Sequence, residues 1–439
     1  MSHVRSSLLA PLAVLSCLTP AAAAQAREPE AAMAARVFAE AEAICARDGG
    51  ALWGQTLCGP SFLVDYRDRR IIANQPDAEG LLVADGPFFR GTLPADVIIA
   101  NTPTEWAGVR WTQLIAELPE DEAGVRVLIA HELFHRIQPS LGLMRGAEGG
   151  NRHLDTLEGR YLLQLEWRAL EQALRADDAA GRKAAVADAL AFRRERYRLF
   201  GTAAGEEAAL EINEGVPEYT GVRLGLATDA DRIAYAIRDL SAFVDAPTFV
   251  RSFAYATGPA YGLLLDGVEP AWLTRVKAGS RFDELLAEGY GLTPADLGDI
   301  DARAARYDDG ALRQAEVARD EARRAQLARF RERLIDGPVL ILPLERANRQ
   351  FNPQTLIPLE GHGMIYPTMR LNDRWGSLVV ESGGALIHDA PSQATVSARG
   401  ADSATARGDG WTLTLEPGWS IGPGPRPDDL QVVCTGACE

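Results

Sequence analysis

The sequence lacks the features of two large classes of protein. Beyond residue 26, no apolar run approaches the ~20 residues that a membrane-spanning helix needs, so we expect no integral membrane span. Basic residues are outnumbered, with 45 Lys and Arg against 61 Asp and Glu, and the formal net charge is −16. Such an excess of negative charge repels phosphate backbones and anionic lipid surfaces. We therefore exclude nucleic acid and anionic membranes as principal partners.

Cysteine is scarce, with five in 439 residues, and their spacing matches no thiolate zinc site. Cys17 lies in residues 1–26, where an early arginine, an apolar run and a small-residue end predict a cleaved secretory signal peptide. A lipid-anchored N-terminus at Cys17 is the less favoured alternative. We thus expect an exported protein, periplasmic or secreted. In that setting the other cysteines predict two local disulfides, although three connectivities are possible: Cys45–Cys58 and Cys434–Cys438.

Histidine is also scarce, yet two of the six histidines stand four residues apart in an HExxH motif. On a helix, positions i and i+4 share one face, so His131 and His135 can hold one metal ion together. Glu132 lies about 100° around the helix, where its carboxylate can reach a water molecule bound to that metal. This combination of residues is typical of a zinc hydrolase.

The sequence around the motif favours a helix of the right length. Pro119, Glu120 and Glu122 are residues that favour a helix start, and Pro139 predicts its end just after His135. Without a metal, the two histidines would simply cap or pack on a buried helix. The motif and its setting together favour the metal site.

A zinc site needs a third protein ligand, and several residues are candidates. A metzincin would have Gly where this chain has Gln138 and His where it has Leu141, so that family is excluded. The remaining common solution is a glutamate from a later helix. Spacing alone leaves three candidates open: Glu158, Glu166 and Glu214.

A downstream segment carries a family resemblance. The segment runs from Asn213 through Glu214, Gly215 and Pro217 to Tyr219. Together with the HExxH motif, it resembles the gluzincins, the thermolysin-like and aminopeptidase-N-like zinc metallopeptidases, whose second branch has an Asn-Glu-Gly-Phe-Ala-x-Tyr segment. The resemblance implies that Glu214 is the third ligand and that Tyr219 matches the tyrosine of that motif. Pro217 stands where the family usually has Ala, and the gap after His135 is longer than in typical relatives.

The same resemblance implies further roles. One Zn²⁺ per chain would bind His131, His135 and Glu214, with Glu132 as the base and Tyr255 as the donor to the oxyanion. Tyr261 is the reserve for that donor. Glu218, which is expected to share a helix face with Glu211 and Glu214, would contact a metal ligand or a substrate amine. Residues 106–115 are expected to form one strand that borders the cleft and pairs with an extended peptide.

Hydrophobic patterning predicts an α+β chain with a small N-terminal sheet, a mostly helical part and an all-β C-terminal module. The resemblance implies that the mostly helical part belongs to a zincin-like metallopeptidase domain. The domain spans residues 27–300, a helical linker 301–336, and the β-rich module 337–439. A helical hairpin over residues 155–200 would be inserted between the histidines and Glu214. Further expected elements are a helix over 30–46, short strands over 62–66, 70–73 and 97–100, and a long helix over 311–334.

Three classes of function follow. The favoured one is an exported zinc metallopeptidase that hydrolyses peptide bonds in a peptide or protein substrate through a zinc-bound water activated by Glu132. The alternative is a catalytically idle zinc-binding envelope protein whose β-module binds a partner. The third is a chaperone-like or structural protein in which HExxH is coincidental.

Overall fold

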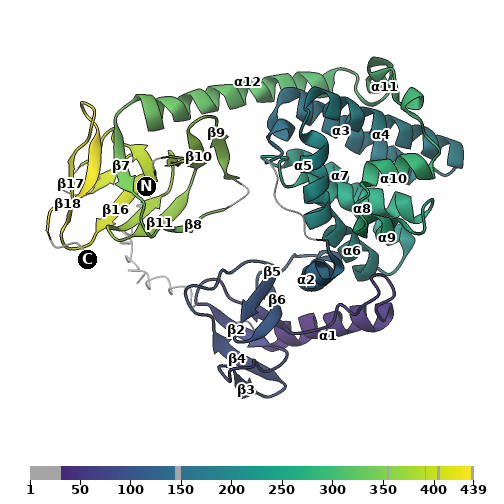
Figure 1. Ribbon diagram of the computed structural model, residues 1–439, viewed down its shortest axis with the longest axis horizontal. Coiled ribbons are helices and arrows are strands. Elements are labelled where there is room, and N and C mark those ends of the chain that lie inside the picture. Colours follow the sequence, from purple (N-terminus) through teal and green to yellow (C-terminus); the bar gives the residue numbers. More distant parts are fainter. Residues whose placement is uncertain (1–30, 144–149, 353–354, 391, 403–405, 437–439) are drawn as a thin grey trace, which may run out of the picture. The chain divides into compact units, whose positions relative to one another are not determined.

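The computed structural model describes residues 31–143, 150–352, 355–390, 392–402 and 406–436 (Figure 1). The predicted signal peptide and Cys438 lie outside these residues. Helices and strands together confirm an α+β chain. Among the described helices, none has the length and apolar character to cross a membrane. The chain divides into two compact units: residues up to Glu40 with Gly59–Pro119, and Ala41–Cys58 with Glu120–Glu439.

The first unit is built on a mixed β-sheet with the strand order β3-β4-β2-β1-β6-β5. Neighbouring strands are antiparallel except β1 and β6, which are parallel. Phe62 and Trp111 lie in its core with ring centroids 5.6 Å apart. The strands are β1 (Ser61–Val64), β2 (Arg70–Ala73), β3 (Val83–Asp85), β4 (Phe88–Thr92), β5 (Thr102–Trp106) and β6 (Val109–Ile115).

The predicted strands of this sheet are partly right. The hairpin expected over residues 62–66 and 70–73 is confirmed as β1 and β2, but residues 97–100 form no strand. The guanidinium of Arg69 donates hydrogen bonds to the carbonyl oxygens of Leu93, Pro94 and Val97. A side chain therefore takes carbonyl groups of this region that a neighbouring strand would otherwise bind.

Residues 106–115 do not form the single strand that the sequence predicted. Ala107 and Gly108 have φ of 49° and 71° and make a tight turn between β5 and β6. Strand β6 pairs with β1 on one side and with β5 on the other. Since both of its edges are occupied, β6 cannot pair with a substrate peptide as expected.

The second unit begins with mostly helical chain. The N-terminal helix α1 (Ala31–Asp48) continues into it from the first unit, close to the predicted bounds. The helices and short helical turns are α2 (Glu122–Ile137), η1 (Gln138–Leu141), η2 (Arg152–Asp155), α3 (Leu157–Arg175), α4 (Ala179–Leu199), α5 (Ala203–Leu210), η3 (Glu211–Gly215), α6 (Val216–Gly225), α7 (Asp229–Ala242), η4 (Phe243–Asp245), α8 (Phe253–Asp266), α9 (Trp272–Lys277), α10 (Phe282–Gly289), η5 (Pro294–Leu297) and α11 (Ile300–Tyr307). Helices α3 and α4 lie side by side and confirm the predicted hairpin (Figure 1). Thr156 and Asp178 cap their N-termini.

A buried cluster of ionic side chains joins this hairpin to the next helical segment. Arg193 of α4 donates hydrogen bonds to Glu166 at 2.8 Å and to Glu211 at 2.6 Å. Arg196 binds Glu207 at 2.6 Å. All five side chains are almost fully buried. Removing one partner of such a pair leaves an uncompensated buried charge, so the cluster fixes where η3 lies against the hairpin.

The predicted disulfide Cys45–Cys58 is confirmed, whereas the pairing of Cys434 with Cys438 involves a residue outside the described part. The disulfide closes a loop that lies against α2. Trp53 in this loop packs on Phe134, with ring centroids 4.8 Å apart, and its Nε1 donates to Thr220 Oγ1 at 3.1 Å. Arg136 of α2 donates to the carbonyl oxygen of Cys58 at 2.7 Å. The loop thus ties the C-terminal half of α2 to α6.

The long helix α12 (Ala311–Arg331) and the π-helical turn η6 (Glu332–Asp336) precede the C-terminal strands, as predicted. Glu316 of α12 is buried and accepts a hydrogen bond from Gln164 of α3 at 2.6 Å. The strands are β7 (Val339–Pro343), β8 (Asn348–Gln350), β9 (Ile357–Leu359), β10 (Gly363–Tyr366), β11 (Met369–Asp373), β12 (Gly376–Val380), β13 (Ala385–His388), β14 (Gln393–Ser397), β15 (Arg407–Gly408), β16 (Trp411–Leu415), β17 (Trp419–Pro423) and β18 (Leu430–Cys434).

These strands form two sheets that share one apolar core. The sheet orders are β17-β18-β7-β14-β13-β10-β9 and β15-β16-β12-β11-β8. Leu340 and Val396 from the first sheet and Leu378 and Trp411 from the second belong to the same buried cluster. This is the layered packing of a β-sandwich.

Replacing Cys45 and Cys58 by Ala should destabilise the second unit by about 2–4 kcal/mol, because the disulfide spans 13 positions and restricts the unfolded chain. Urea unfolding followed by circular dichroism measures the free energy, and hydrogen exchange of the Trp53 segment localises the change. When both proteins are reduced, the wild type and the variant should have the same free energy of unfolding, because neither then has this disulfide. Equal unfolding free energies for the variant and the oxidised wild type would contradict the stabilising role of this loop.

Candidate metal centre

Helix α2 presents both histidines of the motif on one face. Asp121 caps the helix by accepting a hydrogen bond from the Gly124 backbone at 2.7 Å, and the regular helix ends at Ile137. These bounds agree with the predicted start and stop. The Nε2 atoms of His131 and His135 are 2.9 Å apart; His131 is buried and His135 is partly exposed.

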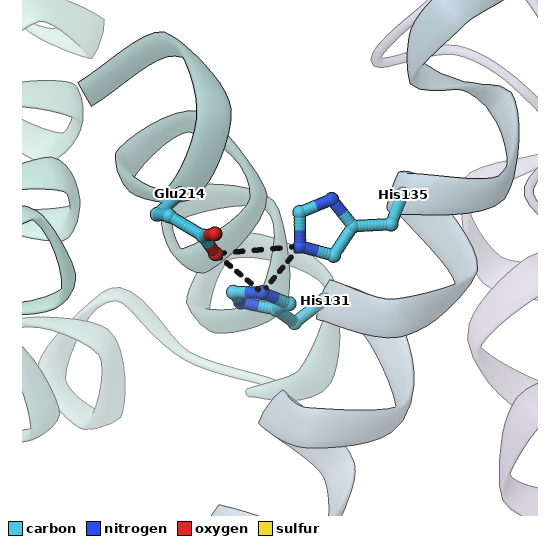
Figure 2. Close-up of side chains that lie close together, drawn as sticks. All are labelled: His131, His135 and Glu214. Carbon is cyan, nitrogen blue, oxygen red and sulfur yellow. Dashed lines mark hydrogen bonds and ion pairs between the residues drawn. The ribbon is translucent and has the colours of Figure 1, made fainter. Parts of the chain in front are cut away.

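Glu214 completes a group of three converging side chains. Its Oε2 lies 3.5 Å from His135 Nε2 and 3.8 Å from His131 Nε2. Figure 2 shows the Glu214 carboxylate facing the two imidazoles of α2. Of the described residues, His131, His135 and Glu214 form a set that could hold a metal ion, with ligand atoms within 4.8 Å of one another.

The close approach of α2 and α6 depends on glycine. A Cβ at Gly221 would come within 2.7 Å of the Val127 carbonyl oxygen, and one at Gly225 within 2.9 Å of the Arg126 backbone. Any larger residue would push α6 away from α2. Because Gly221 and Gly225 have no side chains, α6 can lie close to α2, and this helps to set the position of the Glu214 segment.

A π-helical turn directs Glu214. In η3 the backbone N–H of Val216 donates to the Glu211 carbonyl, five residues back, and this inserts an extra residue into the helix. Glu211 and Glu214 consequently do not share a face as expected. Glu211 binds Arg193 in the buried cluster, while Glu214 faces the histidines.

The second nitrogen of each imidazole has its own partner. His131 Nδ1 donates to Glu218 Oε2 at 2.6 Å, and His135 Nδ1 donates to Gln138 Oε1 at 2.8 Å. When both imidazoles are neutral, their Nε2 atoms then carry lone pairs toward the Glu214 carboxylate. Three acceptors at such distances repel one another unless a proton or a metal cation lies between them. The donor set and its outer partners therefore fit a divalent metal.

Glu214 is also held on both of its oxygens. The Tyr255 hydroxyl donates to Oε2 at 2.7 Å, and Arg251 donates to Oε1 at 3.0 Å. The Tyr255 ring stacks on His131, with centroids 5.7 Å apart. Burial, followed by the charge of Glu214, raises the pKa of Tyr255 well above its usual value, so this phenol keeps its proton.

Glu132 lies beside His131, His135 and Glu214, and one of its carboxylate oxygens accepts no hydrogen bond from the described residues. It is 4% exposed, and its Oε2 has no hydrogen-bond partner among the described residues. Burial raises the pKa of this carboxyl, although the charges of His131 and His135 oppose the shift. A buried carboxylate oxygen without a partner is costly, and a water molecule in the centre would satisfy it.

The other residues considered from sequence lie elsewhere. Glu158 pairs with Arg313 of α12, with one oxygen 2.8 Å from Nη1. Glu166 belongs to the buried ionic cluster, where it also accepts from the Tyr261 hydroxyl at 2.8 Å. The structure therefore does not bring Glu158, Glu166 or Tyr261 to the histidines.

Two residues at the centre were missed by sequence reasoning. Gln138 was used only to exclude another family, although it stands three residues after His135, on the same side of the helix. Arg251 gave no sequence signal, because it lies in the segment before α8 and reaches Glu214 only through the fold.

Comparison of the chain with protein-family models, with curated proteins and with solved structures finds no significant match.

Replacing Glu214 by Ala should weaken zinc binding more than the ~10–100-fold that loss of an outer partner costs, because a direct ligand is removed. Competition with a chromophoric chelator measures the affinity. Glu158→Ala is the matched control and should bind zinc as the wild type does, since Glu158 pairs with Arg313. The reverse order of affinities would indicate that Glu158 of the hairpin, and not Glu214, is the third ligand.

Zinc affinity should rise with pH up to about 9. Burial lowers the pKa of His131, but the hydrogen bond and charge of Glu218 and the charges of Glu132 and Glu214 outweigh it and raise the pKa to about 9. Below that pH zinc must displace a proton, so the apparent affinity should fall about tenfold per pH unit. Chelator competition from pH 6.5 to 9.5 tests this. Glu218→Gln should lower the pH at which the zinc affinity stops rising. If that pH did not change, Glu218 would not be the cause of the raised pKa of His131.

Proposed function

We propose that this chain is an exported zinc peptidase of the gluzincin type, with one zinc ion held by His131, His135 and Glu214. The observation that carries the proposal is the meeting of three lone-pair donors beside the buried, unpartnered carboxylate of Glu132. Two imidazoles and one carboxylate leave a coordination position open for water or substrate, as catalytic zinc sites do. The zincin-like fold of the domain is part of the proposal.

Zinc at this position would polarise the scissile carbonyl and lower the pKa of a bound water toward ~7. Glu132 acts as the base: its carboxylate accepts the proton of the attacking water and then delivers it to the leaving amine. A carboxyl whose pKa is raised by burial is suited to both steps, because it can hold the proton between them.

Tyr255 donates a hydrogen bond to the oxyanion that develops on the carbonyl carbon. Its hydroxyl donates at 2.7 Å to the Glu214 oxygen that faces the histidines, so it lies at the centre where the substrate carbonyl would bind. A neutral donor stabilises the developing charge without adding a charge in the ground state. Glu218 and Arg251 keep His131 and Glu214 in place during these steps.

The cellular setting is proposed on two grounds. The Cys45–Cys58 disulfide favours an oxidising compartment, and residues 1–26 have the pattern of a secretory signal. The substrate is a peptide or protein. The acidic balance of the chain disfavours nucleic acid as a partner.

Replacing Glu132 by Gln should lower peptide cleavage by about 10²–10⁴-fold while zinc binding persists, because the base is lost and the ligands remain. Mass spectrometry of a diverse peptide library digested by the zinc-loaded protein measures cleavage and site preference. The matched control is Glu122→Gln, an exposed carboxylate on the same helix. Stoichiometric zinc without cleavage that depends on Glu132 would instead favour the idle zinc-binding protein.

A further inference from the structure

Gln138 connects the two segments that carry the proposed metal ligands. Its side chain is 1% exposed and lies just beyond the C-terminus of α2. On one side, Oε1 accepts from His135 Nδ1 at 2.8 Å. On the other, Nε2 donates to the carbonyl oxygens of Ile212 at 2.9 Å and Leu143 at 3.1 Å. One amide thus contacts a histidine ligand and the turn that bears Glu214.

The Ile212 carbonyl is available because of the π-helical turn. In a regular α-helix this oxygen would accept the N–H of Val216, but that N–H donates to Glu211 instead. The next residue, Pro217, has no backbone N–H to offer in its place. The Gln138 amide therefore donates to the Ile212 carbonyl oxygen the hydrogen bond that neither Val216 nor Pro217 gives it.

These contacts fix the orientation of the amide. All three partners of Nε2, the third being the Asn213 carbonyl at 3.5 Å, are carbonyl oxygens, which only accept hydrogen bonds, so a flipped amide would set Oε1 against acceptors. With Oε1 toward the imidazole, His135 must carry its proton on Nδ1. Its Nε2 is then left with a lone pair directed at the centre, 3.5 Å from Glu214 Oε2.

We propose that Gln138 is a positioning residue of this centre, which sets the ring protonation of His135 and at the same time fixes the Glu214 turn against the end of α2. The inference rests on the proposed metal site, and it does not require that the site cleave peptides. Gln138 touches no reacting atom and acts through His135 and the Ile212 carbonyl.

The test compares three variants. Gln138→Met keeps the side-chain length and removes every hydrogen bond. Gln138→Glu keeps an acceptor for His135 but loses the amide donors. Gln164→Met is the matched control, because Gln164 is also a buried glutamine with hydrogen bonds in the same unit, to Glu316.

Three readouts are needed. Long-range ¹H–¹⁵N correlation of ¹⁵N-histidine in the metal-free protein reports which ring nitrogen of His135 carries the proton, with the signal assigned by a His135→Gln spectrum. Hydrogen exchange of residues 211–217 reports the stability of the turn. Chelator competition gives the zinc affinity.

We expect Gln138→Met to lose the Nδ1–H form of His135, to speed exchange in the turn and to weaken zinc binding about 10–100-fold. Gln138→Glu should keep the Nδ1–H form yet speed exchange, because only the donor side is lost. Gln164→Met should leave the ring protonation and the exchange of the turn unchanged.

A Gln138→Met protein with wild-type His135 protonation would overturn the proposal, even if its stability fell, because Gln138 would then be merely structural. Unchanged exchange in the turn would overturn it equally. If the wild type bound no zinc, the proposed function would fail. The histidine spectra of the metal-free protein would still test whether Gln138 sets the ring protonation of His135. If zinc bound without peptide cleavage, only the peptidase proposal would fail.

Discussion

One electrostatic constraint governs the group between α2 and η3: the Nε2 atoms of two imidazoles and a carboxylate oxygen meet in a space largely shielded from water. His131, His135 and Glu214 would repel one another at these distances without a positive charge between them. Each is nevertheless held in place by an outer partner that the rest of the fold fixes. Glycines on α6 allow the backbones of α2 and α6 to approach, and Glu218 is carried on the same helix. The packing thus supplies the geometry of the group, and the positive charge that this geometry requires would come from a proton on His131 or from the proposed metal ion.

The hairpin of α3 and α4 does more than lengthen the chain between His135 and Glu214. The sequence analysis treated it only as an insertion that leaves the two proposed metal-binding helices free to meet. In the structure its Arg193 binds Glu211 at the start of η3, and its Arg196 binds Glu207 one turn earlier. Two buried ion pairs therefore anchor the segment just before Glu214, and losing one partner of such a pair costs about 3–5 kcal/mol. The hairpin is the support against which the Glu214 segment is held.

Much of this architecture could be predicted, and the failures have physical causes. Helix α2 was placed well because Pro119, Glu122 and Pro139 are local signals. The Cys45–Cys58 disulfide was predicted because its two cysteines are close in sequence. Spacing left the third ligand open among Glu158, Glu166 and Glu214, because the arginines that pair with the first two come from other helices. The π-helical turn has no local signature except Pro217, so the separation of Glu211 from Glu214 was missed. Residues 97–100 failed as a strand, because side chains rather than a neighbouring strand bind their carbonyl oxygens: Arg69 binds that of Val97 and Gln113 that of Ile98.

The extra residue in η3 also determines how this protein can change over generations. Deleting one residue between Glu211 and Gly215 would restore ordinary helical spacing and turn the side chains on one side of the deletion by about 100° relative to those on the other. Glu211 could then remain with Arg193 only if Glu214 left the histidines, or the reverse. The Ile212 carbonyl would return to the helix and leave the Gln138 amide without its acceptor. Substitutions at exposed positions leave the placement of Glu211, Glu214 and the Ile212 carbonyl unchanged. Residues around the site can therefore be replaced more readily than the length of this turn can change.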